Sequence, residues 1–527
     1  MKRVAFHNLG CKVNNYELDI MRQKMEEHGY ISVPFEEEAD VYVINTCTVT
    51  NIADRKSRQM IHKAKKRNPG AVVIAVGCYV ETDPDRVGTD EAIDLAIGNN
   101  NKSRIAELLD EFLSQIGNDK PAEQKANRLS QRTLGGRTMT DLTHRPEYED
   151  MQLEAPGHTR AFVKIQDGCN QFCTYCIIPY ARGRIRSRRP GEIIREVTRI
   201  AEKGIREVVL TGIHVSSYGL EWDAETDAVR FDPIKSGGFL LDLMDRIRRI
   251  PGIERIRLSS LEPRIMTESF VKGIAGMPEV CPHFHLSLQS GCNATLRRMN
   301  RHYTTEEFME SVRLLRKYYD RPAITTDVIV GFPGESNAEF GETVKFLEEV
   351  NFYEMHVFKY SVRKGTAAAR MPVQIPEPVK AARSDILLEM TERQSRAYRR
   401  QFLPQSTSEV DCTVGGAFAP AESELTSEVK CTVGGAFAPA ESELTSEVDC
   451  TEELLLEEPV KMSWGTCWRG HTKRYVEGYI LIGREGAQTG QNTAGSGSTL
   501  QAGQLVKGHF TKEADGAPGL IFEPLEG

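Results

Sequence analysis

Apolar runs alternate with amphipathic stretches along most of the chain, and this pattern predicts strands separated by helices. In the first domain, three short apolar runs at residues 4–6, 41–44 and 72–76 indicate strands. Helical periodicity occupies the stretches between them, such as residues 16–28 and 54–67. Because strands that alternate with helices form parallel sheets, we expect an N-terminal α/β domain built on a parallel sheet.

The same alternation returns after residue 157. Six apolar runs separated by helical stretches predict an incomplete (β/α)6 barrel, in which functional groups gather at the carboxyl ends of the strands. The predicted strands are residues 161–165, 207–210, 255–258, 284–288, 325–330 and 355–360, and the predicted helices include residues 191–203, 239–249, 305–317 and 338–349.

The last part of the chain combines a repeat with short alternating segments. A 19-residue unit occurs twice between residues 408 and 445, and a third copy is truncated. The copies are nearly identical and hold few large apolar residues, so we interpret them as a tandem duplication. Cys412, Cys431 and Cys450 occur at the same position of each copy, and we interpret them as part of the duplicated unit without a role of their own. A metal-binding tract is the alternative. The alternating segments that follow predict a small β-barrel with a loop at residues 487–498.

These patterns predict an α/β fold with a separate small β-barrel. We place the N-terminal domain at residues 1–117 and a polar, Pro- and Gly-containing linker at 118–156. The incomplete barrel follows at 157–390, and the C-terminal domain occupies 391–527, interrupted by the repeats at 408–450.

Composition narrows the class of protein. The 527 residues are 40% hydrophobic and 27% charged, which is typical of a globular protein. The chain has no run of 18 apolar residues and no signal-peptide pattern, so we expect a cytoplasmic protein without membrane contact. Twelve cysteines in such a protein indicate metal binding or catalysis. The net charge of −8 means that any RNA contact requires local basic patches.

Three closely spaced cysteines are the most informative chemical feature. Cys169, Cys173 and Cys176 form a C-x3-C-x2-C motif after the first predicted barrel strand. Three thiolates on one loop suit a [4Fe–4S] cluster with one open iron, whereas zinc prefers four ligands and ferredoxins use a different spacing. The open iron suits S-adenosylmethionine (SAM), which one electron would cleave to a 5′-deoxyadenosyl radical.

A second set of cysteines is spread over the N-terminal domain. Cys11, Cys47 and Cys78 each follow one of the three predicted strands by a few residues. Loops after parallel strands share one edge of the sheet, so we expect these thiols to converge and to hold a second [4Fe–4S] cluster. Taken singly, each cysteine is also typical of a small buried side chain.

Strand-end motifs predict the SAM site. Glycines there allow a nucleoside to approach the backbone closely, and two polar side chains at the end of the fourth predicted strand, Ser287 and Gln289, point the same way. No side chain is assigned to acid–base catalysis. The candidate SAM-binding residues are Tyr175, Thr211, Gly212, Ser287, Gln289 and Gly331.

Three segments rich in basic residues are candidates for RNA contact, with solvated surface as the alternative. One follows the cysteine loop, one lies on a helix of the first domain, and one interleaves aromatic with basic residues near the C-terminus. They contain Arg182, Arg184, Arg186, Arg188 and Arg189; Arg55, Lys56, Arg58, Lys63, Lys65, Lys66 and Arg67; and Trp468, Arg469, His471, Lys473, Arg474 and Tyr475.

Residues 9–14, 45–59 and 160–169 carry a resemblance to a known family. In these segments the chain resembles the methylthiotransferases of the radical SAM superfamily, and most closely the branch acting on N6-threonylcarbamoyladenosine in tRNA. The branches acting on isopentenyladenosine and on a ribosomal protein look different after the first two auxiliary cysteines. The resemblance implies an N-terminal cluster domain, a radical SAM domain and a C-terminal TRAM domain that binds RNA.

The resemblance also implies a reaction and its partners. The N-terminal cluster supplies sulfur, one SAM methylates it, and a second yields the radical that removes hydrogen from C2 of adenosine 37 in the tRNA anticodon loop. An electron donor such as flavodoxin or ferredoxin and a monomeric state are expected. The alternatives are the same chemistry on N6-isopentenyladenosine 37 or on an aspartate of ribosomal protein S12, and an RNA-binding protein with structural clusters.

Overall fold

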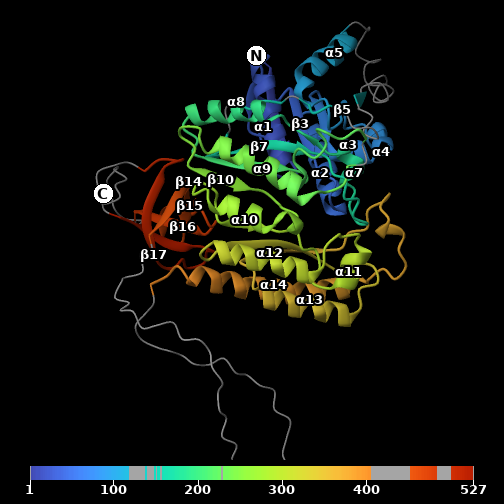
Figure 1. The fold of residues 1–527 in the computed structure, drawn as a ribbon. Helices are drawn as coiled ribbons and strands as arrows, with labels where there is room; N and C mark the ends of the chain where they lie inside the picture. Colours follow the sequence, from blue (N-terminus) through green and yellow to red (C-terminus); the bar gives the residue numbers. More distant parts are fainter. Residues whose placement is uncertain are drawn as a thin grey trace, which may run out of the picture.

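The computed structural model divides into an N-terminal sheet, a partial barrel and a C-terminal barrel (Figure 1). The predicted repeats at 408–450, the predicted loop at 487–498 and most of the predicted linker lie outside the described residues. Cys412, Cys431 and Cys450 are therefore not placed. The structure describes residues 2–117, 137–138, 147–149, 151–154, 157–226, 229–404, 451–483 and 500–525.

The N-terminal unit is a parallel sheet in the order β2-β1-β3-β4-β5-β6, as the sequence predicts. Apolar side chains on one face pack against α1 and α5, and those on the other face pack against α2 and α3. The strands are β1 (Arg3–Asn8), β2 (Ile31–Val33), β3 (Val41–Thr46), β4 (Val72–Gly77), β5 (Leu95–Ile97) and β6 (Arg137–Thr138); the helices are α1 (Lys12–Glu27), α2 (Asn51–Arg67), α3 (Cys78–Thr82), α4 (Pro84–Thr89), η1 (Lys102–Arg104) and α5 (Ile105–Gly117).

Six parallel strands follow one another in chain order and form the predicted incomplete barrel. Two sheets, β8-β7-β9-β10 and β11-β12-β13, meet through bridges at Ile256–Val280 and Leu261–Leu286. The fourth strand is shorter than predicted and ends at His285. Beyond it only isolated bridges continue, at Leu286 and Gln289, and Gln289 adopts a φ of +73°. The strands are β7 (Arg160–Asp167), β8 (Arg186–Ser187), β9 (Glu207–Gly212), β10 (Arg255–Leu258), β11 (His283–His285), β12 (Ala323–Val330) and β13 (Glu354–Lys359).

The two faces of these strands differ sharply in polarity. Alternate residues point to opposite faces of a strand, and Val163, Val208 and Leu258 face the helices in the main apolar core. The intervening positions put charged side chains such as Lys164 and Arg257 on the inner face. The helices and 3-10 turns are α7 (Ile178–Arg182), α8 (Pro190–Glu202), η2 (Val215–Ser217), α9 (Pro233–Ile247), η3 (Pro263–Ile265), α10 (Glu268–Ala275), α11 (Asn293–Arg298), α12 (Thr305–Tyr318), α13 (Asn337–Val350), η4 (Ala368–Arg370) and α14 (Glu377–Arg400).

The C-terminal unit is the predicted small β-barrel, closed in the order β14-β15-β16-β18-β17. Its apolar core continues into the partial barrel through Tyr353 and Tyr398. Because α14 runs on to Arg400, the domain boundary predicted at residue 390 falls inside a continuous helix. The described part of the chain contains no helix with the length and apolarity of a membrane span. The strands are β14 (Glu452–Met462), β15 (Gly465–His471), β16 (Glu477–Gly483), β17 (Leu505–Glu513) and β18 (Leu520–Pro524).

Candidate active site

The loop after β7 brings Cys169, Cys173 and Cys176 to one cavity of about 140 Å³. Gly168 starts the loop with a φ of +69°, and a Cβ there would lie 1.9 Å from the carbonyl oxygen of Arg184. Only glycine fits such a close backbone approach. A hydrogen bond of 2.9 Å from the Cys176 N–H to the Cys173 carbonyl closes the second turn of the loop.

The cysteine loop is fastened to the segment after α11. The Thr174 N–H donates to the carbonyl of Met299 at 3.0 Å. The guanidinium of Arg301 donates from Nη1 to the sulfur of Cys173 at 3.3 Å. This contact fixes the position of the Cys173 sulfur within the loop.

Glu262 places a carboxylate in the same cavity. Its Oε2 lies 2.9 Å from Nε2 of His214 and accepts a hydrogen bond of 2.9 Å from Gln171. Burial acts to raise the pKa of Glu262, but its hydrogen bond with His214 and the charge of Arg301 lower that pKa to about 2. Glu262 is thus an anion that can accept hydrogen bonds from a bound ligand. Glu262 and Arg301 were not predicted from the sequence; a strand-end position four residues after β10 was the available signal for Glu262.

The six predicted SAM-binding residues separate into two groups. Tyr175, Ser287 and Gln289 line the cavity beside the cysteines. The other three are not among its lining residues, and two glycines among them make room for neighbouring side chains. A Cβ at Gly212 would meet Gln166, and one at Gly331 would meet Lys380, while Thr211 is buried in β9. SAM contact stays a prediction for all six: Tyr175, Thr211, Gly212, Ser287, Gln289 and Gly331.

The N-terminal sheet brings the second set of cysteines together at its carboxyl edge. Cys11 precedes α1, Cys47 follows β3, and Cys78 begins α3 directly after β4. Burial raises the pKa of Cys47 to about 12, and the adjacent thiols of Cys78 and Cys11 act in the same direction. Cys11 remains exposed, so the site opens to solvent on its side.

The spacing of the thiols suits an iron–sulfur cluster better than a single metal ion. Three sulfur ligands at about 2.3 Å from one ion lie within about 4.6 Å of one another. Among the described residues, the only group of three or more potential ligand atoms within 4.8 Å of one another is that of His285, Asp327 and His356. Neither cysteine triad is that compact, so a single ion does not account for either triad. Burial also raises the pKa of Cys176 to about 12, which a bound cationic cluster would reverse.

Helix α7 connects the two cysteine sites. Arg182, its last residue, donates from Nη2 to Oδ1 of Asn14 at 2.8 Å, three residues after Cys11. Asn99 donates to the carbonyl of Ala181 at 2.7 Å, and its Nδ2 lies 3.6 Å from the sulfur of Cys78. The segment after the first triad is therefore held directly against the residues around the second.

Buried ion pairs strengthen this connection and correct one prediction. Arg182 lies 2.8 Å from Glu17 of α1 and 3.2 Å from Asp167 of β7, and both carboxylates are buried. These charges hold the N-terminal sheet against the partial barrel. The predicted phosphate contacts are therefore wrong for the three buried arginines, while Arg184 is partly exposed and Arg189 is exposed. The buried arginines are Arg182, Arg186 and Arg188, whose partners include Asp167 for Arg186 and Glu196 for Arg188.

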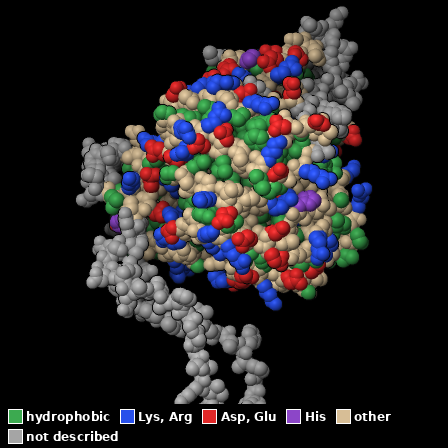
Figure 2. Space-filling view, viewed as in Figure 1, with side chains coloured by type: hydrophobic (Ala, Val, Ile, Leu, Met, Phe, Trp, Pro, Cys, Tyr) green, Lys and Arg blue, Asp and Glu red, His purple; other side chains and the backbone are tan. Residues whose placement is uncertain are grey.

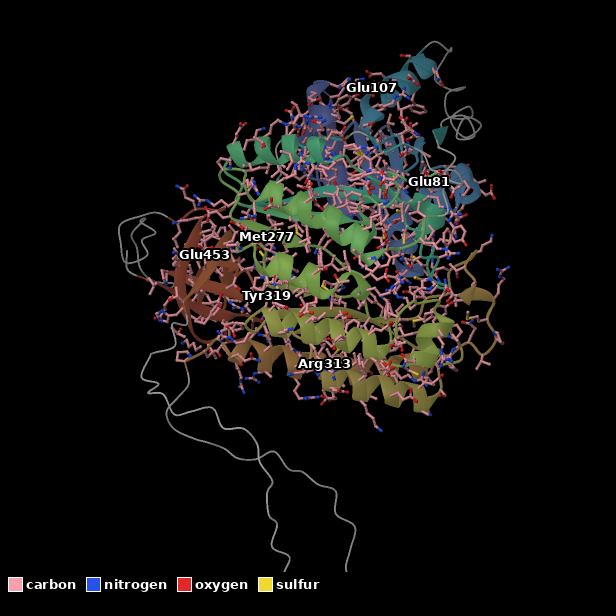
Figure 3. The ribbon with its side chains drawn as sticks, viewed as in Figure 1. Glu81, Glu107, Met277, Arg313, Tyr319 and Glu453 are labelled. Atoms are coloured by element: carbon pink, nitrogen blue, oxygen red, sulfur yellow. The ribbon has the colours of Figure 1, made fainter. Side chains whose placement is uncertain are left out.

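The aromatic and basic segment near the C-terminus also turns inward. The ring of Tyr475 lies 4.9 Å from the guanidinium of Arg257 and 5.1 Å from that of Arg160, and it stacks on His283 at 5.0 Å. Arg255 donates to the backbone carbonyl of Glu453 at 2.7 Å; Figure 3 labels Glu453 on the C-terminal barrel. Tyr475 therefore joins the two barrels, and the prediction that it stacks on RNA bases is wrong.

Lys12 is a cation next to the second cysteine site. Lys12 directly follows Cys11, and among the described residues it forms no ion pair. Burial and the charges of Arg257 and Arg160 lower the pKa of Lys12 to about 8, although Asp327 acts in the opposite direction. An ammonium group surrounded by further cations favours an anionic ligand and disfavours a metal ion at the neighbouring His285 cluster.

A partial parallel barrel with three cysteines on its first loop, joined to an α/β domain with a second triad, defines a radical SAM enzyme with an auxiliary cysteine site. The sequence model of the Radical SAM superfamily matches residues 163–347, and that of Uncharacterized protein family UPF0004 matches residues 3–98. Solved structures include a similar one of the radical SAM methyltransferase TsrM from Kitasatospora setae, at 17% identity and a TM-score of 0.46, covering 76% of this chain and 85% of that chain.

Relatives that align over most of their length show to which family the chain belongs. Threonylcarbamoyladenosine tRNA methylthiotransferase MtaB of Bacillus subtilis (strain 168) is 39% identical, over 76% of this chain and 83% of the relative. The protein of the same name from Aquifex aeolicus (strain VF5) is 40% identical, over 75% and 89%. A tRNA-2-methylthio-N(6)-dimethylallyladenosine synthase of Pelotomaculum thermopropionicum is 33% identical, over 74% and 82%. The chain belongs to the radical SAM methylthiotransferase family, whose cofactors are SAM and [4Fe–4S] clusters.

Proposed function

We propose that this enzyme converts N6-threonylcarbamoyladenosine at position 37 of tRNA to its 2-methylthio derivative. The observation that carries the proposal is the pair of cysteine triads that α7 holds against each other through Arg182 and Asn99. Sulfur insertion at an unactivated C–H bond needs both a radical source and a sulfur source. Two separate cysteine sites at one junction supply places for both.

The residues divide the work between the two sites. Cys169, Cys173 and Cys176 hold the cluster that, when bound, supplies the electron for cleaving SAM. Glu262 presents an anionic acceptor beside this triad, and Arg301 donates a hydrogen bond to the sulfur of Cys173. Cys11, Cys47 and Cys78 hold the auxiliary cluster that provides the sulfur.

Lys12 supports threonylcarbamoyladenosine over the alternative substrates. The threonylcarbamoyl group carries a carboxylate, and an ammonium without an ion-pair partner beside Cys11 can bind it. An isopentenyl group is apolar and offers Lys12 no carboxylate to bind. The aspartate of a ribosomal protein is also anionic, but the relatives at 39% and 40% identity are named for tRNA modification.

The proposal also covers the C-terminal domain, the oligomeric state, the location and the electron donor of the enzyme. We infer that the C-terminal barrel is a TRAM domain, that the enzyme acts as a monomer in the cytoplasm, and that a flavodoxin or ferredoxin supplies its electrons. The closed five-stranded barrel supports the first inference, and tRNA as substrate supports the location.

Nucleoside analysis of tRNA tests the proposal. Reconstituted enzyme should form 2-methylthio-N6-threonylcarbamoyladenosine on tRNA that carries threonylcarbamoyladenosine, and not on isopentenyladenosine tRNA or ribosomal protein S12. The Cys11/Cys47/Cys78→Ala variant should still cleave SAM and should form no methylthio product. Product from this triple variant would remove the auxiliary triad from the mechanism.

A Lys12→Gln variant tests substrate choice separately. Loss of one charge-assisted hydrogen bond should lower kcat/KM on the threonylcarbamoyl substrate by about 10- to 100-fold. Its iron content and its SAM cleavage without tRNA should match those of the wild type. Unchanged kcat/KM would show that Lys12 does not contact the threonylcarbamoyl group.

A further inference from the structure

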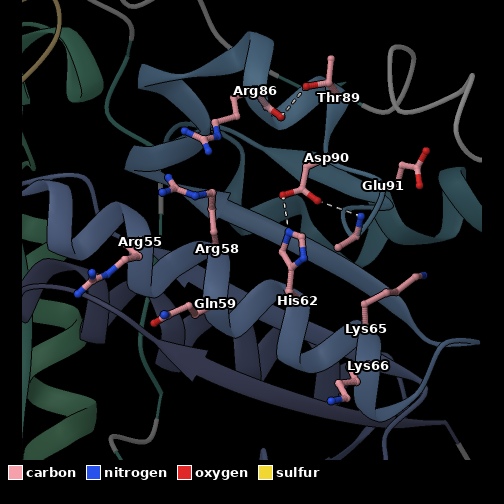
Figure 4. Close-up of a pocket in the computed structure, with 11 residues that line it drawn as sticks. Arg55, Arg58, Gln59, His62, Lys65, Lys66, Arg86, Thr89, Asp90 and Glu91 are labelled. Carbon is pink, nitrogen blue, oxygen red and sulfur yellow. Dashed lines mark hydrogen bonds and ion pairs between the residues drawn. The ribbon is translucent and has the colours of Figure 1, made fainter.

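A wide groove of about 960 Å³ lies along α2, outside both cysteine sites (Figure 4). Helix α2 forms one wall, and α4 with the turn after it forms the other. The basic residues of the groove are Arg55, Arg58, His62, Lys65, Lys66 and Arg86.

The sequence of α2 puts its basic residues on one face. Residues 55, 58, 62, 65 and 66 follow the three- and four-residue spacing of neighbours on a helix surface. The opposite face, with Ser57, Ile61 and Ala64, is buried against the sheet. Because the apolar face is fixed by packing, the basic face must be presented to the groove.

Most of these charges have no acidic partner. Lys65 pairs with Asp94 at 2.8 Å, and His62 pairs with Asp90 at 3.0 Å. Glu91 also lines the groove, but its carboxylate points away from the basic side chains in Figure 4. Within the described ranges, ion pairs are absent for the remaining four basic residues: Arg55, Arg58, Lys66 and Arg86.

The groove leads toward the cysteine site. Helix α2 begins four residues after Cys47, and Asp54 in its first turn pairs with Arg363 of the partial barrel at 2.7 Å. An apolar rim surrounds this junction: the exposed fractions are 55% for Val49, 56% for Ile52 and 41% for Val362. Ile52 lies three residues before Arg55 on α2, so the apolar rim adjoins the basic face along the same helix, which covers about 21 Å from Ile52 to Lys66.

We infer that the α2 groove binds the sugar–phosphate backbone of the substrate tRNA, through Arg55, Arg58, Lys66 and Arg86, while the apolar rim contacts unstacked loop bases. This inference rests on the proposed function only in taking tRNA as the substrate. Guanidinium groups match phosphate geometry, and apolar surface suits unpaired bases.

The net charge of the chain makes a local basic patch necessary for binding RNA. The chain carries a net charge of −8, so RNA must be attracted by a basic region and not by the molecule as a whole. The face seen in Figure 2 interleaves acidic with basic side chains and offers no such region. An acidic protein such as the electron donor is the other class of partner, but it would not need an apolar rim at the substrate entrance.

A charge-neutralising variant with a matched control tests the inference. Arg55, Arg58, Lys66 and Arg86 are changed to Gln in the full-length enzyme. The control changes four exposed basic residues of α9, the turn after it, and α12 to Gln, with the same change in net charge; Figure 3 labels one of them, Arg313. The control residues are Arg246, Arg249, Arg313 and Lys317.

Fluorescence anisotropy with tRNA is measured between about 50 mM and about 200 mM salt. The groove variant should bind on the order of tenfold or more weakly at low salt, and the slope of log K against log salt should fall by about three to four. The control should keep the wild-type slope. SAM cleavage with a chemical reductant and iron content should be unchanged in both variants.

The outcomes separate the inference from the proposed function. A wild-type enzyme without affinity for tRNA would contradict the proposed function itself. Wild-type binding with an unchanged slope in the groove variant would overturn the groove assignment alone. Unchanged tRNA binding with slower reduction by flavodoxin would assign the groove to an acidic protein donor and would also overturn it.

Discussion

Two arginine-rich segments with similar local composition lie in opposite environments. Arg182, Arg186 and Arg188 are buried, and their charges meet carboxylates inside the protein. Arg55 and Lys66 of α2 are exposed and have no ion-pair partner among the described residues. The same signal in the sequence therefore marks a structural joint in one region and a candidate binding surface in the other.

The partners of the buried segment explain the difference. Arg182 meets Glu17, which lies 165 residues away in the sequence. Arg188 meets Glu196 of the following helix, α8. A sequence pattern alone cannot show the distant pairing with Glu17. Helix α2 has only Asp54 in its first turn, and Arg363 already neutralises it. Basic residues predict nucleic-acid contact reliably only after acidic partners elsewhere in the fold are known.

The largest expected effect comes from removing one buried arginine. Arg182→Ala leaves Glu17 and Asp167 short of a buried partner, so we expect the free energy of unfolding to fall by about 3–5 kcal/mol. Urea unfolding measures this loss. Arg189→Ala, at the exposed end of the same segment, is the control and should cost less than about 1 kcal/mol. Equal losses in the two variants would contradict the assigned difference between them.

An intermediate effect should follow from pH at the joint between the two barrels. Burial and the charge of Arg160 lower the pKa of His471 to about 3, so the folded protein holds it neutral. The unfolded chain takes up the proton below about pH 6.5, so stability is full above that pH and decreases as the pH falls toward 3. Glu457, Glu477, Arg257 and Glu207 also face this imidazole.

Between about pH 7 and about pH 5.5, this one group should lower the free energy of unfolding by about 1 kcal/mol. Urea unfolding at both pH values gives the loss for the wild type and for His471→Gln. The variant should lose about 1 kcal/mol less than the wild type over this interval. Burial raises the pKa of Glu452. Glu452 is present in both the wild type and the His471→Gln variant, so its titration does not contribute to the difference between them. An identical loss in both would show that His471 is not held neutral.

The smallest expected effect on stability belongs to the exposed segment. Lys66→Gln should change the free energy of unfolding by less than about 0.5 kcal/mol, because the side chain lies on the surface. In tRNA binding it should lower the slope against log salt by about one. A destabilisation comparable to that of Arg182→Ala would mean that α2 has a structural role instead.

Local sequence patterns predicted the strands and helices because the alternation of apolar and polar side chains within each element determines which face it buries. Strand β10 begins and ends where predicted, and the cysteine loop follows β7 as expected. Convergence of Cys11, Cys47 and Cys78 followed from the topology of parallel sheets. The cavity was harder to predict: Glu262 and Arg301 enter it from separate loops. The strand-end position was the one signal for Glu262, and only the three-dimensional neighbours of Arg301 identify it. Tyr475 was misread because a buried cation–π contact and an RNA-stacking face use the same residue types.

The length of the short helix α7 determines how the two cysteine triads are positioned relative to each other. Arg182 and the carbonyl of Ala181 reach across to the N-terminal sheet from fixed positions after Cys176. One extra residue in this helix would rotate everything beyond it by about 100° and shift it by about 1.5 Å. Both contacts would then be lost together, although every cysteine and every cluster ligand would remain. The number of residues between Cys176 and Arg182 therefore sets the position of the two triads relative to each other, and it matters as much as the identity of the residues at either end.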